Sequence, residues 1–203
     1  MLRAEFGKNH TMIFGKDSPK IMQSPRSKHA HFKSKICKHC NSNQTQAADR
    51  AFDQLHIEQT KIRTSGYALN VELSPEEELN VCRYFAKLLC CFLAEVGGPR
   101  SRSISRFALR KSDKNPIFLS VTQDTEYEGK RLTNNTQGLA EHGGLTFRFD
   151  NQKRLVKSIE SSISAGGIKY DFWVELFWPS SLELYFDHND IVRKARASII
   201  ESE

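Results

Sequence analysis

The sequence predicts an α+β fold, in which a small CxxC module precedes a region with one long core helix and a mostly antiparallel sheet. Apolar residues recur at helical spacing between Val81 and Val96, whereas after Pro116 they alternate with a period of two. The gaps between the later apolar stretches lack the helices that parallel crossovers need. We expect two units, residues 1–62 and residues 67–203, which pack together across a short linker.

The first unit begins with loops and ends in a helix. Residues 1–36 are rich in Gly, Lys, Ser and Pro, and they predict loops plus a hairpin whose first strand is Thr11–Phe14. Asn43 or Thr45 is placed to cap a helix that runs to about Gln59. The predicted buried stripe of this helix is Ala48, Phe52 and Leu55, and the predicted outward residues are Asp49, Arg50 and Asp53.

The second unit starts with the clearest helix signal in the chain, Ser74-Pro75-Glu76-Glu77. Ser is a good N-cap, Pro fits the first turn, and Glu three residues after Ser completes a capping box. Gly97-Gly98 should end this core helix. A second, short helix is predicted over residues 101–110. The cysteines on or beside the core helix are predicted to be buried structural thiols: Cys82, Cys90 and Cys91.

The remaining elements are strands. The predicted strands are Ile117–Val121, Leu145–Phe149, Ile168–Phe177 and Leu182–Phe186, with turns at Asn134-Asn135 and Gly143-Gly144. In the third strand the apolar residues Ile168, Tyr170, Phe172, Val174 and Leu176 should share one face. Asn189–Glu201 is predicted to close the chain as an amphipathic helix.

Composition and the absence of common motifs exclude several classes of protein. The longest apolar run, residues 88–94, is far below the ~20 residues needed to span a bilayer, so we expect no membrane partner. Five cysteines without a secretory leader predict a reducing cytoplasm. The chain contains no Gly-x-Ser-x-Gly, P-loop or dinucleotide-binding motif.

Positive charge is concentrated near the N-terminus. Residues 1–64 hold 12 Lys/Arg against 5 Asp/Glu, and residues 65–203 hold 18 against 19. Such a segment attracts nucleic-acid phosphates through counterion release, although a solvated basic arm is the alternative. The predicted nucleic-acid contacts are Lys28, His29, His31, Lys33, Lys35 and Lys38.

The pair Cys37 and Cys40 lies two residues apart, directly before Asn41 and the first predicted helix. Two thiolates at this spacing can face one metal ion, and a structural zinc site takes four such ligands. The candidate further ligands are the histidines of the same region, His10, His29, His31 and His39.

The stretch ICKHCN at 36–41, followed by QAADRAFD at 46–53, resembles the C-terminal half of an HNH-type (ββα-metal) nuclease module. The resemblance spans about residues 8–56. It implies that Cys37 and Cys40 hold structural zinc, that Asn41 faces a catalytic Mg²⁺-like ion, and that His10 is the general base. Members with a zinc knuckle usually carry another CxxC upstream, which this chain lacks, so we expect either a start upstream of Met1 or a module that has lost catalysis.

The resemblance therefore implies a nucleic-acid-binding protein with DNA as the expected partner, and a metal-dependent endonuclease if the site is complete. The alternative is a non-catalytic zinc-knuckle protein that binds a protein or nucleic-acid partner. His10 as a solvent-exposed loop residue and Asn41 as a helix cap are the corresponding structural alternatives.

Overall fold

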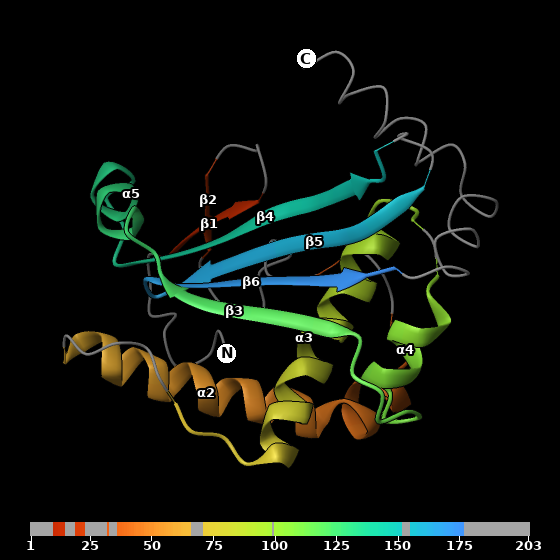
Figure 1. Cartoon of the computed structure of the whole chain (residues 1–203). Helices are drawn as coiled ribbons and strands as arrows, with labels where there is room; N and C mark the ends of the chain where they lie inside the picture. The colour runs from red at the N-terminus through yellow and green to blue at the C-terminus, as the bar shows by residue number, and fades with distance from the viewer. Residues whose placement is uncertain are drawn as a thin grey trace.

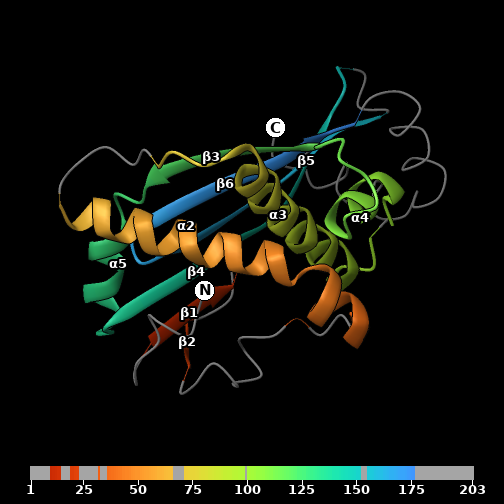
Figure 2. The same cartoon turned by 90° about the horizontal axis from the view of Figure 1, so that it is seen from below.

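The computed structural model describes residues 10–14, 19–22, 32, 36–65, 71–98, 100–151 and 155–176. The fold is α+β, as predicted. Six strands form one sheet in the order β2-β1-β4-β5-β6-β3, and all neighbouring pairs are antiparallel except β1 and β4. Helices α2 and α3 lie against one face of this sheet (Figures 1 and 2).

The helix layer follows the sequence signals closely. A single π-helical turn, η2 (Cys40–Gln44), leads into α2 (Gln46–Thr64), which runs five residues beyond its predicted end. The core helix α3 (Pro75–Glu95) begins with the predicted capping box, because Ser74 and Glu77 bond each other's backbone N–H groups. The short helix α4 (Arg102–Ala108) follows.

The sheet is built mainly from the C-terminal half of the described chain. Its antiparallel part contains β3 (Ile117–Gln123), β4 (Gly138–Phe149), β5 (Val156–Ala165) and β6 (Ile168–Glu175). Strand β1 (His10–Phe14) and its hairpin partner β2 (Lys20–Met22) add to the edge at β4. Helix α5 (Tyr127–Thr133) connects β3 to β4.

One sequence prediction in this sheet is wrong, and two elements were missed. Gly143-Gly144 does not form a turn but lies within β4, where the register with β5 shifts between His142 and Leu145. A Cβ on Gly143 would collide with the Ser162 hydroxyl, and Gly144 has a φ of +71°, so both glycines serve a bulge. Helix α5 was not predicted. Strand β5 was not predicted either, because its four serines weaken the apolar alternation that indicates a strand. The predicted elements Leu182–Phe186 and Asn189–Glu201 lie outside the described residues.

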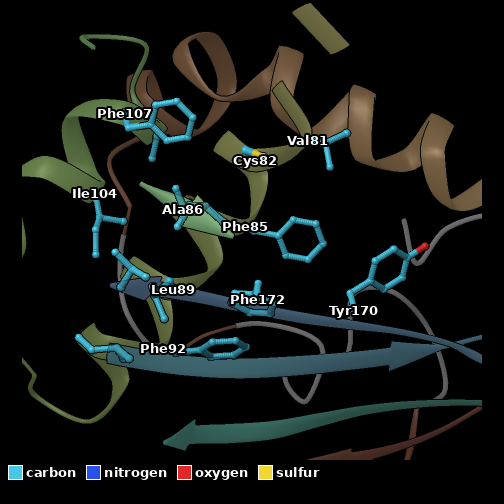
Figure 3. Packing of buried hydrophobic residues seen from close by; sticks show 14 of the residues in the cluster. Val81, Cys82, Phe85, Ala86, Leu89, Phe92, Ile104, Phe107, Tyr170 and Phe172 are labelled. Carbon is cyan, nitrogen blue, oxygen red and sulfur yellow. The ribbon is translucent and has the colours of Figure 1, made fainter. Parts of the chain in front are cut away.

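The core lies between α3 and the sheet (Figure 3). Phe85 and Phe92 of α3 face Phe172 of β6, with ring centroids 4.9 Å and 6.3 Å apart. Phe52 of α2 enters the same core, 5.2 Å from Phe85 and 5.1 Å from Tyr170. The helix that follows the CxxC pair therefore packs together with the second unit, as the short linker led us to expect.

The cysteines of α3 match their prediction, since Cys82 and Cys91 are buried and Cys90 is half-buried. None of the helices in the described part of the chain has the length and hydropathy that a membrane crossing needs.

Candidate functional site

The segment Cys37–Cys40, here called the knuckle, lies just before α2 at one end of the molecule (Figure 2). The backbone N–H of Cys40 donates a hydrogen bond to Cys37 Sγ at 3.2 Å, and the N–H of Asn41 donates to the Cys37 carbonyl at 3.0 Å. The chain thus turns tightly around the first sulfur. The knuckle runs directly into the π-helical turn η2, a backbone form that is frequent at functional sites.

The two thiols are not equivalent. Hydrogen bonds from the Cys40 thiol and from the Cys40 backbone N–H lower the pKa of Cys37 below its ordinary value. The same hydrogen bond between the two thiols is the main cause that raises the pKa of Cys40, and partial desolvation raises it further. Because thiolates are the species that bind metals, Cys37 is the sulfur better prepared to do so.

The knuckle holds two free thiols that could ligate a metal. Within the described residues no group of three His, Cys, Asp or Glu side chains is close enough to hold one metal ion. His39, between the cysteines, is exposed, and its Nδ1 lies 3.5 Å from the Asn43 side-chain amide. The candidate ligands His29 and His31 lie outside the described residues.

The residues predicted to be catalytic lie in different parts of the structure. Asn41 is exposed in η2, and its carbonyl accepts a hydrogen bond from the Thr45 hydroxyl at 3.2 Å. His10 begins β1, in register with Met22 of β2 and Gly138 of β4. In both views β1 and the start of α2 lie apart (Figures 1 and 2). The described structure therefore does not bring His10 and Asn41 together.

Of the predicted nucleic-acid contacts, only Lys38 belongs to the described residues, and it is exposed on the knuckle. Lys28, His29, His31, Lys33 and Lys35 lie outside them. One further anchor of this region is Phe32, whose ring packs edge-to-face on Phe92 of α3 with centroids 5.0 Å apart. The chain leading to the knuckle therefore touches the C-terminal end of the core helix.

Sequence reasoning missed a cation whose charge acts on the knuckle. After the hydrogen bonds from Cys40 and from the His39 backbone, the positive charge of Lys111, in the segment after α4, is a further and smaller cause of the lowered pKa of Cys37. Lys111 is far from the cysteines in sequence, and only tertiary packing places its charge close to them. The signal that could have found it is the local density of basic residues around α4.

Three other polar residues make contacts that the sequence did not predict. Asp49 was predicted to face outward, but both its carboxylate oxygens lie 2.8 Å from Lys87 Nζ, since α2 and α3 pack side by side. His56 of α2, for which the sequence predicted no role, is buried, and its Nδ1 lies 2.9 Å from the Tyr170 hydroxyl. His142, directly before the predicted Gly143-Gly144 turn, lies in β4 and stacks on Phe92.

Comparison with known proteins adds no relative: no family model matches this chain, and neither a curated protein nor a solved structure does.

Proposed function

We propose that the protein is an HNH-like nucleic-acid-binding protein whose knuckle supplies half of a structural zinc site. The observation that carries this proposal is the arrangement of Cys37 and Cys40, with a backbone N–H directed at the first sulfur and a lowered thiol pKa there. A structural zinc site takes four thiolate or imidazole ligands.

The donor set at the knuckle fits zinc in kind. Cys37 and Cys40 are free thiols, one exposed and one partly exposed, and they meet through a shared hydrogen bond. When bound, zinc would tie the segment before the knuckle to the start of α2. The candidates for the further ligands are the histidines of this region, among them His29 and His31, whose other predicted role is contact with phosphates, because imidazole is the usual companion of thiolate in such sites.

A nucleic acid is the proposed partner because of charge. The N-terminal 64 residues carry 12 Lys/Arg against 5 Asp/Glu, and Lys38 is exposed on the knuckle itself. Binding of cations to phosphates releases condensed counterions, which favours association at moderate salt. DNA is the expected form, by the resemblance to HNH modules.

Cleavage of DNA is a separate prediction. It would require His10 to accept a proton from water and Asn41 to face a divalent ion at the same phosphate. Since β1 and the start of α2 lie apart in the described structure, we favour the non-catalytic form of the proposal, in which the knuckle is structural.

Metal content tests the zinc site. We expect about one zinc ion per chain in protein purified without added metal, and none in the Cys37→Ser/Cys40→Ser variant. Elemental analysis measures both, and Cys82→Ser is a control that removes a buried thiol of α3. A folded wild-type protein without zinc would refute the metal site.

Cleavage is tested on plasmid DNA with Mg²⁺ or Mn²⁺. In the non-catalytic form, wild-type protein binds the plasmid and leaves it intact. If cleavage is seen, the HNH assignment requires that His10→Ala or Asn41→Ala lower its rate by roughly 100-fold or more. Cleavage that survives Asn41→Ala would exclude the knuckle as the catalytic site.

A further inference from the structure

A dense group of cations surrounds α4, well separated in sequence from the basic N-terminal region. Residues 100–114 hold six basic side chains and one acidic side chain. The six, here called the α4 cluster, are all exposed: Arg100, Arg102, Arg106, Arg110, Lys111 and Lys114. Residues 65–203 as a whole are nearly neutral, because acidic residues elsewhere in this range offset the positive charge of the cluster.

The fold holds the α4 cluster in place through the other face of the helix. Ile104 and Phe107 are fully buried in the core, so Arg102 and Arg106, one turn apart, are presented to solvent. The helix is capped at its start, where the Ser101 hydroxyl accepts the Ile104 N–H. The cations therefore project from an anchored element.

Most of the α4 cluster is uncompensated. Among the residues that the structure describes, only Arg110 of the six has a carboxylate within ion-pair distance, Glu76 at 3.9 Å. Several cations outside the cluster are paired with acids: Lys61 with Glu58, Lys130 with Glu141 and Arg131 with Glu128, at 2.8–2.9 Å. Unmatched like charges repel one another, which is typical of a surface that binds an anion.

Arg110 also adopts a backbone conformation that its side chain disfavours. Its φ is +57°, and the Lys111 N–H behind it bonds the Arg106 carbonyl at 2.8 Å, the closing bond of a Schellman motif. Glycine is the usual residue at this position, and a Cβ there is destabilising. The only other non-glycine residue with positive φ in the described chain is Asn135, a type that tolerates it. An arginine at a position where glycine would be less strained points to a role for its charge.

The α4 cluster lies on the same side of the molecule as the knuckle. In both Figure 1 and Figure 2, α4 and the start of α2 are at one end, while α5 and the C-terminal end of α2 are at the other. A phosphate backbone crossing this end would meet cations from both segments.

We propose that the α4 cluster is a binding face for the phosphate backbone of nucleic acid, which extends the contact from the knuckle onto the second unit. This inference rests on the proposed function and names the residues that would make most of its contacts. Arginines present several N–H donors to phosphate oxygens, and such contacts position a protein without reading sequence.

Binding to a labelled mixed-sequence DNA duplex, measured by fluorescence anisotropy over a range of salt concentrations, tests the inference. For Arg102→Gln/Arg106→Gln we expect the dissociation constant near ~0.1 M salt to rise about tenfold or more, and the salt slope of log K to fall by roughly two. The matched control is Lys61→Gln/Arg131→Gln, which removes the same charge at the opposite end. It should change the dissociation constant less than about twofold.

Arg110→Gly is a second, sharper variant. It relieves the backbone strain while deleting the cation, so we expect the melting temperature to rise and the affinity for the duplex to fall. A merely structural role for Arg110 would leave affinity unchanged.

The outcomes separate the two proposals. If wild-type protein binds the duplex and the α4 and control variants weaken it equally, the α4 inference is wrong and the proposed function stands. If wild-type protein binds no duplex even at low salt, both are wrong. If it binds vesicles of phosphatidylcholine and phosphatidylserine but no duplex, the ligand is a membrane surface and the inference is overturned.

Discussion

His56 and Tyr170 show how one residue pair joins the helix layer to the sheet. The His56 Nδ1 and Tyr170 hydroxyl oxygen lie 2.9 Å apart, and both side chains are almost fully buried. Around them, the rings of Phe52 and Phe85 exclude water. In such surroundings a polar group must be hydrogen-bonded, because its desolvation is otherwise uncompensated.

We expect Tyr170→Phe to lower the free energy of unfolding by about 1–3 kcal/mol, since it deletes the hydroxyl but keeps the ring. Chemical denaturation followed by circular dichroism measures this. The control is Tyr84→Phe, which removes a hydroxyl from a ring stacked on Phe52 and should change stability by roughly 0.5 kcal/mol or less. Equal effects of the two substitutions would show that the His56 bond contributes nothing.

At the scale of elements, α3 is held at its start by the capping box. The Glu77 carboxylate accepts the Ser74 N–H at 2.9 Å and the Ser74 hydroxyl at 2.6 Å. These bonds from Ser74 lower the pKa of Glu77 below its model-peptide value. Ionised Glu77 therefore stabilises the folded state above its unfolded pKa, and this stabilisation is lost as pH falls through the lower, folded pKa.

The resulting prediction concerns Glu77→Gln. We expect the variant to melt below the wild type at neutral pH, and the difference to shrink as the pH falls below about 4, where the wild-type carboxylate becomes protonated. Thermal melts across this pH range measure it. Glu78→Gln removes the same charge from the same turn and controls for charge alone. A difference that stays constant down to pH ~2 would contradict the linkage.

At the scale of the whole molecule, a single core spans both predicted units. Phe52 of α2 packs against Phe85 of α3 and Tyr170 of β6, so the helix after the knuckle is stabilised by two later elements, one of them more than a hundred positions away. A side chain shared in this way couples the stability of the three elements.

We therefore expect Phe52→Ala to lower the free energy of unfolding by about 3–5 kcal/mol and to shift the helix and tryptophan signals together. Far-ultraviolet circular dichroism and tryptophan fluorescence in one denaturant series report the two. Ile57→Ala, on the exposed side of α2, should cost far less. Separate transitions for the two signals would mean that the units unfold independently.

Local signals were sufficient for much of the fold. The capping box at Ser74 and the alternation through Ile168, Tyr170 and Phe172 each lie within a few residues, so they predicted α3 and β6. The sequence did not predict strand β5, because its serines interrupt the apolar alternation that indicates a strand. Pairing with β4 and β6 on either side holds it in the sheet. The bulge at Gly143-Gly144 depends on Ser162 across the ladder, which sequence spacing cannot reveal.

The features of the candidate site also fall into those that the sequence predicted and those that depend on tertiary packing. The sequence by itself determined the CxxC spacing, the helix that follows it and the basic character of the region, because these depend on neighbours along the chain. Only the tertiary structure decided that His10 lies on a sheet edge away from Asn41, and that α4 presents its cations at the knuckle's end of the molecule. The physical reason is that strand pairing and core packing join residues that are distant in sequence, and the burial of Ile104 and Phe107 selects which face of α4 meets solvent.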